Sequence, residues 1–310
     1  MPAAKVILLM GATATGKTEL ALEISRRFDV EIISVDSALI YRGMNIGTAK
    51  PEPEILQSVP HHLIDIIDPV EAFSVWDFVQ QSRRLVDEIV ERGRIPLLVG
   101  GTMMYFHAFE HGLNRLPEAN EALRQRLDLE AQEKGWQAMH DKLAEVDPLS
   151  AKRIKPTDSQ RIQRALEVYQ IAGEPLSRLH QQKSNGYSGQ IEKIILAAND
   201  RARLHQRIES RFLSMLDRGF VEEVLNLKAR GDLDLSLPSM RCVGYRQLWQ
   251  FLDGDLSRQE MIDKGIAATR QLAKRQITWL RKQPQENAFD CLNYSKDAIF
   301  DVVKAAFKRL

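Results

Sequence analysis

The sequence contains few cysteines, no long apolar run and almost no net charge. Only two of its 310 residues are cysteines, Cys242 and Cys291. Two thiols cannot build a disulfide framework or a four-cysteine zinc site, and we interpret them as free thiols of a reducing compartment. No stretch approaches the ~18 uninterrupted apolar residues of a membrane helix, and the run Val6 to Met10 is too short for a signal-peptide core. We therefore expect a cytoplasmic protein.

The formal net charge of +1 hides a gradient along the chain. Acidic residues outnumber basic ones over positions 1–100, whereas residues 201–310 carry 20 Lys and Arg against 14 Asp and Glu. A basic surplus confined to one region is a weak indication of contact with nucleic acid there.

Short apolar runs alternate with helical patterns in the first third of the chain. The runs Lys5 to Met10, Val30 to Val35 and Ile95 to Val99 are separated by helical spacing over Thr18 to Phe28 and Phe78 to Arg92. This alternation is typical of a parallel sheet covered by helices on both faces. Polar residues that follow such strands lie at the carboxyl edge of the sheet, where open α/β folds bind ligands.

From about Arg115 the pattern changes to consecutive helices. Glu121 to Lys134, Trp136 to Glu145 and Ser159 to Ala172 show no strand between them, and strand character returns only at Ile191 to Ala198. We therefore predict an all-helical insertion domain at residues 115–190, within an α/β core formed by residues 1–114 and 191–310.

A phosphate-binding motif lies at Gly11 to Thr18. This segment, GATATGKT, matches G-x-x-x-x-G-K-[ST] at every fixed position, follows an apolar strand and opens a helix. Its backbone amides and the helix N-terminus can present donors and positive potential to a phosphate, while Lys17 adds a charge and Thr18 a hydroxyl ligand for Mg²⁺. The core is therefore predicted to be P-loop NTPase-like. The motif leaves open which phosphates bind, because nucleotides and diphosphate esters fit the same cradle.

The expected metal-holding acid of P-loop NTPases is missing from its usual place. The run Ile95 to Val99 is followed by Gly100-Gly101-Thr102, whereas an acid, Asp36, follows the second apolar run. A carboxylate at this position could hold a metal or accept a proton from a nucleophile. Alternatively, Asp36 caps a following helix, since Asp is a favoured cap.

Six sequence blocks together resemble a known family. In chain order they are GATATGKT, ISVDSALIYRGMNIGTAKP (Ile33 to Pro51), HHLIDIIDP (His61 to Pro69), LLVGGTMMY (Leu97 to Tyr105), RCVGYRQ (Arg241 to Gln247) and TRQLAKRQITWLR (Thr269 to Arg281). The family is that of the bacterial tRNA dimethylallyltransferases, and the resemblance covers nearly the whole chain.

The resemblance implies a reaction and its residues. A dimethylallyl group would pass from its diphosphate to N6 of adenosine 37 of tRNA, with Asp36 as general base, Arg211 on the diphosphate, Thr102 in the site and Mg²⁺ as cofactor. The residues implied for the diphosphate are Gly11, Ala12, Thr13, Ala14, Thr15, Gly16, Lys17 and Thr18. Those implied for tRNA are Asp36, Ser37, Ala38, Leu39, Thr102, Arg124, Ser159, Gln160, Arg161, Ile162, Gln163, Arg241, Cys242, Val243, Gly244, Tyr245, Arg246, Lys274, Arg275, Gln276, Ile277, Thr278, Trp279, Leu280 and Arg281.

The manner of tRNA binding also follows from the resemblance. The target adenine is expected to leave the anticodon loop to reach the cradle, and the insertion domain to close over the anticodon stem-loop. A monomer is the simpler expectation for an enzyme that encloses one stem-loop. Five basic residues occupy less than half of the circumference of one predicted helix: Arg270, Lys274, Arg275, Arg281 and Lys282. Charge alone leaves a solvated helix face equally open, and the resemblance favours phosphate contacts on tRNA.

Two other functions remain open from the residues themselves. A small-molecule kinase would use ATP in the same cradle, although the glycine pair before Thr102 speaks against it. A nucleotide-driven RNA-binding switch would need a coupling element that the sequence does not reveal. A metal site at His61 and His62 is not expected, because no cysteine or acid stands at ligand spacing.

Overall fold

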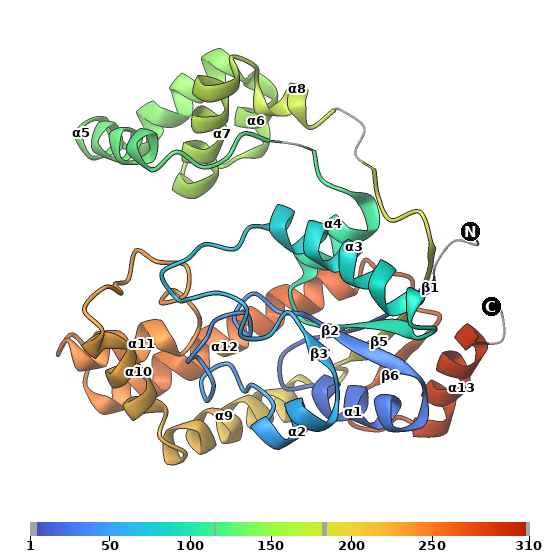
Figure 1. Cartoon of the computed structure of the whole chain (residues 1–310). Helices are drawn as coiled ribbons and strands as arrows, with labels where there is room; N and C mark the ends of the chain where they lie inside the picture. Colours follow the sequence, from blue (N-terminus) through green and yellow to red (C-terminus); the bar gives the residue numbers. More distant parts are fainter. Residues whose placement is uncertain (1–4, 115, 182–184, 308–310) are drawn as a thin grey trace. The chain divides into compact units, whose positions relative to one another are not determined.

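The computed structural model describes residues 5–114, 116–181 and 185–307. Arg115, at the predicted start of the insertion, lies outside the described residues. The chain divides into two compact units: Met1–Glu110 with Ser188–Leu310, here the core unit, and His111–Tyr187, here the helical unit. Figure 1 traces both in sequence colours.

The core unit is built on one parallel sheet of six strands. Its strands, in the order β3-β2-β4-β1-β5-β6, are β3 His61–His62, β2 Val30–Val35, β4 Ile95–Gly100, β1 Lys5–Gly11, β5 Gln190–Ala197 and β6 Ala288–Asp290. All residues of β1, β2 and β4 are buried, which explains why these strands are continuous apolar runs rather than alternating ones. The predicted parallel sheet with flanking helices is confirmed.

Helices cover both faces of this sheet. In Figure 1, α1 (Lys17–Arg27) and α13 (Lys296–Phe307) lie on one face, and α3 (Val75–Glu91) and α4 (Met103–His111) lie on the other. Helix α3 begins before the predicted Phe78, because Ser74 and Asp77 form a capping box that satisfies the first free amides.

A second hydrophobic core lies beside the sheet. It is formed by α9 (Arg201–Asp217), α10 (Phe220–Ala229), α11 (Tyr245–Leu252) and α12 (Arg258–Leu280). Ile40, Tyr41 and Met44, from the loop between β2 and α2 (Pro53–Ser58), pack into the same core. This loop is therefore fixed by burial on the C-terminal helices.

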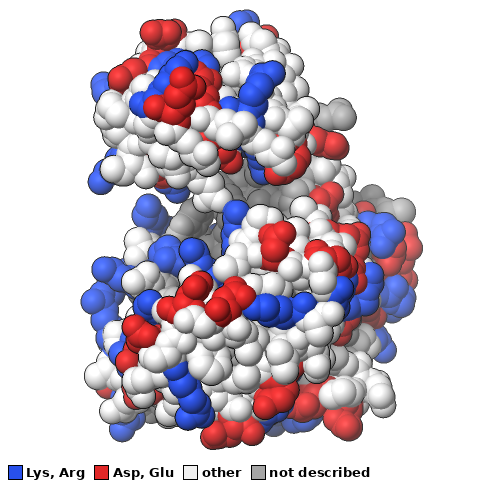
Figure 2. Space-filling model, turned by 90° about the vertical axis from the view of Figure 1, so that its left-hand side faces the viewer, with Lys and Arg blue, Asp and Glu red and all other residues white. Residues whose placement is uncertain are grey.

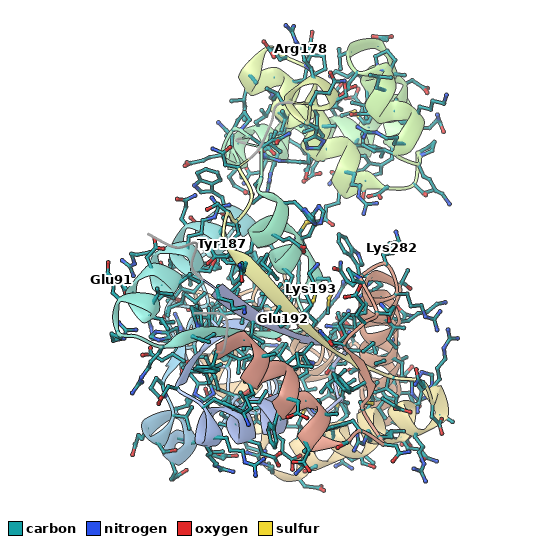
Figure 3. All side chains as sticks on the ribbon, turned by 90° about the vertical axis from the view of Figure 1, so that its right-hand side faces the viewer. Glu91, Arg178, Tyr187, Glu192, Lys193 and Lys282 are labelled. Carbon is teal, nitrogen blue, oxygen red and sulfur yellow. The ribbon has the colours of Figure 1, made fainter. Side chains whose placement is uncertain are left out.

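Strand β5 is tied to neighbouring elements by two adjacent side chains, labelled in Figure 3. Lys193 Nζ lies 2.6 Å from Glu110 Oε1 of α4 and donates to Gln283 Oε1, just after α12, at 2.9 Å. Glu192 Oε1 accepts from Asn287 Nδ2 at 2.7 Å. The C-terminal end of α12 is thereby fixed to the sheet.

The helical unit contains α5 (Glu121–Val146), α6 (Pro148–Arg153), α7 (Ser159–Ala172) and α8 (Leu176–Leu179), around its own apolar core. Gly135, with φ 82° and ψ 155°, interrupts α5, which explains why the sequence predicts two helices there. The buried Glu167 carboxylate accepts bonds from Arg124 Nε at 2.9 Å and Arg164 Nη1 at 2.6 Å. Within the described part of the chain, no helix is long and apolar enough to cross a membrane.

Candidate active site

The loops that follow β1, β2 and β4 meet at the carboxyl edge of the sheet. Gly100, the last residue of β4, pairs in register with Met10 of β1 and with Val35 of β2. The phosphate loop, Asp36 and Thr102 therefore leave the sheet at the same level. The parallel sheet alone brings together residues that are far apart in the sequence.

The phosphate loop holds its amides ready for an anion. Gly16 adopts φ 90°, a left-handed conformation that favours glycine, and Ala14 adopts φ 64°. Thr15 Oγ1 donates to the Ala12 carbonyl at 2.8 Å and closes the loop. Among the described residues, none accepts a hydrogen bond from the N–H of Ala14, Thr15 or Gly16. These donors precede the N-terminus of α1, where the helix dipole favours negative charge.

Lys17 contributes a positive charge of lowered basicity. Its Nζ donates to the Ala12 carbonyl at 2.6 Å. Burial and the positive charge of Arg211 together lower the pKa of Lys17 to about 8, against the opposing effect of Asp36. An anion bound in the loop would favour the charged form.

Arg211 reaches the same place from α9. Burial lowers the pKa of its guanidinium, while the negative charge of Asp36 raises it. Each of the three groups, Lys17, Asp36 and Arg211, thus lies within the electrostatic reach of another. Asp200 fixes the start of α9, because its side chain accepts from Arg203 N. The structure brings these three predicted site residues together.

The Asp36 side chain stabilises the loop that follows β2 and does not cap a helix. Its Oδ1 accepts from the N–H of Ala38 at 2.8 Å and of Leu39 at 3.4 Å, and the next helix, α2, starts only at Pro53. The helix-cap alternative is therefore wrong. No hydrogen bond to Oδ2 is formed by residues 5–114, 116–181 or 185–307. One carboxylate oxygen holds the loop, and the other is available as an acceptor.

Thr102 locks the Asp36 loop to the end of β4. Its Oγ1 accepts from Ser37 N at 3.1 Å, and its own N–H donates to the Val35 carbonyl at 3.1 Å. Gly100 permits this approach, since a Cβ there would lie 2.0 Å from the Val35 carbonyl oxygen. The glycine pair that takes the place of a metal-holding acid thus serves close packing.

Sequence reasoning missed two anchors of the loop after β2. Glu223 of α10 accepts from the N–H groups of residues 45–47 at 2.7 to 3.1 Å and from Tyr245 Oη at 2.6 Å. Lys50, only 8% exposed, pairs with Asp65 and donates to the Tyr41 carbonyl at 3.0 Å. Lys50 and Asp65 lie in two of the blocks quoted above, which is the one signal that could have indicated them.

The residues predicted for tRNA differ in their surroundings. On α12 and just after it, Lys274, Arg275, Arg281 and Lys282 are exposed, and none pairs with an acid in the part of the chain that the structure describes. Arg270 differs, because its Nη2 lies 2.8 Å from Glu209 Oε2. Lys282 is labelled just past α12 in Figure 3. Figure 2 shows acids and bases mixed over the face it presents.

Several other predicted tRNA residues are engaged within the fold. Tyr245 is buried against Glu223, Leu280 is buried, and Gln276 bonds to two loops of the site. In the helical unit, Arg124 pairs with Glu167, and Ser159 to Gln163 form the start of α7, capped by Asp158.

The histidine pair stabilises β2. His62 Nε2 contacts Glu31 Oε2 at 2.7 Å, and His61 Nδ1 contacts the Val59 carbonyl at 2.8 Å. Glu31 also receives a bidentate bond from Arg92 at 2.8 and 2.9 Å. Residues 5–114, 116–181 and 185–307 contain no group of three or more His, Cys, Asp or Glu that could hold a metal ion.

A parallel sheet with a phosphate loop after its first strand, flanked by two cations and a carboxylate, defines an α/β protein of the P-loop class with a site suited to an anion. Comparison with known proteins narrows this class. The family model described as IPP transferase matches residues 39–283. A tRNA dimethylallyltransferase of a Polaromonas species is 54% identical, with 93% of this chain and 91% of that protein covered. The chain belongs to the IPP transferase family and is a transferase.

Solved structures agree with this assignment. The full-length tRNA isopentenylpyrophosphate transferase of Bacillus halodurans superposes with a TM-score of 0.69 at 38% identity, over 98% of this chain and 96% of that chain. A eukaryotic dimethylallyltransferase described as acting on tRNA gives a TM-score of 0.78 at 24% identity, over 93% of this chain and 74% of that chain, and supports the fold.

Proposed function

We propose that this enzyme transfers a dimethylallyl group from dimethylallyl diphosphate to N6 of adenosine 37 in tRNA, next to the anticodon. The observation that carries the proposal is the convergence of the phosphate loop, Lys17, Arg211 and Asp36 at one sheet edge, in a chain 54% identical to a tRNA dimethylallyltransferase. The bond from the allylic carbon to the diphosphate oxygen breaks, and a bond from that carbon to the adenine nitrogen forms.

The cradle stabilises the departing diphosphate. Negative charge accumulates on the leaving group in the transition state, and preorganised donors placed there lower the barrier. The amides of Ala14, Thr15 and Gly16 supply fixed dipoles, and Lys17 and Arg211 supply charge.

Asp36 takes the proton that the adenine amine loses as the new bond forms. General-base catalysis needs an acceptor within hydrogen-bonding distance of that amine. The Oδ2 atom meets the chemical requirement, since Oδ1 is already bonded to Ala38 and Leu39. Thr102 and Ser37 hold the carboxylate in place.

Mg²⁺ would fit this site when the diphosphate substrate is bound, because the substrate would supply most of its oxygen ligands. The ion is commonly bound by one or two protein oxygens plus substrate phosphates and water. Thr18, which is exposed at the start of α1, would supply the protein oxygen, and the diphosphate would supply the rest. The bound ion would neutralise charge on the leaving group.

The tRNA anticodon stem-loop would lie along the exposed cations of α12. Lys274, Arg275 and Arg281 would bind phosphates and position the substrate without reading its sequence. The adenine would leave the stacked loop to reach Asp36. The helical unit, through Arg124 and the start of α7, would close over the same substrate, with the enzyme acting as a cytoplasmic monomer.

A donor-discrimination assay tests this function. The purified protein is incubated with Mg²⁺, unmodified tRNA and either dimethylallyl diphosphate labelled in the prenyl group or ATP labelled at the γ-phosphate. Prenyl label entering tRNA supports the proposal. Phosphoryl transfer without prenyl transfer would instead establish the kinase alternative.

A further inference from the structure

The side chain of Gln276 joins α12 to two loops of the active site. Its Oε1 accepts from Thr13 N of the phosphate loop at 2.8 Å, and its Nε2 donates to the Gly101 carbonyl at 2.9 Å. Gln276 is half-buried and follows directly after the exposed Lys274 and Arg275. One amide therefore connects a basic helix face to the loops that end β1 and β4.

The amide group of Gln276 satisfies both contacts with one acceptor and one donor. The Thr13 N–H can only donate and the Gly101 carbonyl can only accept, so the bridging group needs one acceptor and one donor. Glutamate would place an oxygen against the carbonyl, and methionine would serve neither partner. Gly101 is matched to this contact, because a Cβ there would lie 2.6 Å from Gln276 Nε2.

Each of the two residues that Gln276 contacts directly precedes a residue of the proposed active site. Thr13 precedes the free amides of Ala14, Thr15 and Gly16, which receive the diphosphate in the proposed function. Gly101 precedes Thr102, whose Oγ1 holds Ser37 N beside Asp36. A small displacement of α12 would thus shift both the phosphate loop, which is proposed to receive the diphosphate, and the loop that holds Asp36.

Helix α12 is held in place by contacts on both sides of Gln276. Ala273, one turn earlier, is buried in a cluster with Ala12, Leu204 and Ile208. The C-terminal end is fixed to β5 through Lys193 and Gln283. The helix therefore contacts the phosphate loop through both an apolar and a polar contact, and its opposite face carries the unpaired cations.

We propose that Gln276 is a positioning residue that couples tRNA binding on α12 to diphosphate binding in the phosphate loop. The inference rests on the proposed function, since it requires both substrates to bind this unit. Binding of tRNA phosphates to Lys274 and Arg275 fixes α12, and Gln276 passes this restraint to Thr13 and Gly101. By linkage, each ligand then raises the affinity for the other by the same factor.

Equilibrium binding measures this coupling without any reaction. The affinity for inorganic diphosphate with Mg²⁺ is determined by calorimetry with and without unmodified tRNA, for the wild type, Gln276→Met and Gln276→Glu. Gln271→Met, an exposed glutamine on the same helix, is the matched control. We expect tRNA to tighten diphosphate binding about tenfold in the wild type and in Gln271→Met, and less than twofold in Gln276→Met. Gln276→Glu keeps an acceptor for Thr13 and should retain part of the coupling.

The possible outcomes separate the two proposals. An unchanged coupling factor in Gln276→Met, or a wild type in which tRNA has no effect on diphosphate affinity, would overturn the role of Gln276. If Gln276 had a purely structural role, Gln276→Met would lower the melting temperature and would weaken diphosphate binding equally with and without tRNA. The coupling factor, which is the ratio of these two affinities, would then be unchanged, and this result would also overturn the proposal. If the wild type binds neither ligand and transfers no prenyl group, the proposed function itself fails.

Discussion

At the scale of single residues, the two carboxylate oxygens of Asp36 have different surroundings. Oδ1 holds the loop through Ala38 and Leu39, and Oδ2 is the atom proposed to accept the proton. Asn at this position keeps an oxygen for the loop amides and loses the basicity. We predict that Asp36→Asn lowers prenyl transfer by about 10² to 10⁴-fold.

Binding of inorganic diphosphate separates this effect from misfolding. Calorimetry should give an affinity for Asp36→Asn equal to or above that of the wild type, because a negative charge near the anion is removed. Transfer near the wild-type rate would show that another group takes the proton.

Lys17 gives a pH prediction at the same scale. Its lowered pKa of about 8 means that the neutral amine predominates above that pH in the free enzyme. Only the charged form attracts the diphosphate, so affinity should fall as pH rises from 7 to 9. Lys17→Arg stays charged throughout this range.

The protonation of diphosphate itself changes with pH and affects both proteins alike. Its effect therefore cancels in the ratio of the wild-type affinity to that of Lys17→Arg. We expect this ratio to fall by up to about tenfold for each pH unit above 8. Calorimetry should also detect proton uptake on binding near pH 8. A flat ratio across this range would contradict the assigned basicity of Lys17.

Sequence reasoning reached some of these residues and not others. The phosphate loop and Asp36 follow apolar runs, so their place at the sheet edge could be predicted from local pattern. Gln276 and Glu223 act on loops 263 and 176 to 178 residues away, and nothing local marks such contacts. Gln276 was assigned to tRNA by its block, although its amide bonds to protein.

At the scale of elements, β2 contains the buried carboxylate of Glu31 and is followed directly by Asp36, the proposed base. The bidentate bond from Arg92 holds the pKa of Glu31 at about 2, with further help from His62. A carboxyl group with a lowered folded-state pKa stabilises the fold fully above its unfolded pKa of about 4.5, and this stabilisation is lost as pH falls toward 2.

We therefore predict that Glu31→Gln lowers the free energy of unfolding at pH 7 by about 3 kcal/mol and removes part of its dependence on pH below 5. Urea unfolding at several pH values measures both effects. Glu54→Gln, at an exposed position of α2, should change neither. Equal losses in both variants would contradict the role of the Glu31 cluster.

Helix α12 gives the prediction for tRNA. Each lost phosphate contact should lower the slope of log affinity against log salt by about 1 and weaken binding of all tRNA sequences alike. We predict this for Lys274→Ala and Arg275→Ala, measured by filter binding over a salt series. Lys264→Ala, exposed nearer the start of the same helix, should keep the wild-type slope. An equal change at Lys264 would assign the effect to net charge rather than to specific contacts.

Element boundaries were predictable where burial was strong. Strand β2 matches its apolar run, and β1 and β4 extend theirs by one glycine. Strands β3 and β6 have 2 and 3 residues and are too short for a periodic pattern. The break in α5 at Gly135 was predictable, because the sequence pattern gives two helices that meet there, whereas the packing of both segments on one core is a tertiary effect that the pattern does not contain.

At the scale of the whole molecule, a net charge of +1 coexists with a substrate that is a polyanion. On α12 and just after it, Lys274, Arg275, Arg281 and Lys282 are exposed and pair with no acid among the described residues, while Glu31, Glu167 and Glu223 are bonded within the fold. The average charge therefore says little about the partner, and the position of the unpaired charges says more.

The proposed reaction prenylates a single adenine of tRNA. The protein, Mg²⁺ and dimethylallyl diphosphate are incubated with an unmodified tRNA, which is then digested and analysed by mass spectrometry. We predict N6-dimethylallyl adenosine at position 37 and at no other nucleotide. Absence of a prenylated adenosine, or prenylation at a different position, would contradict it.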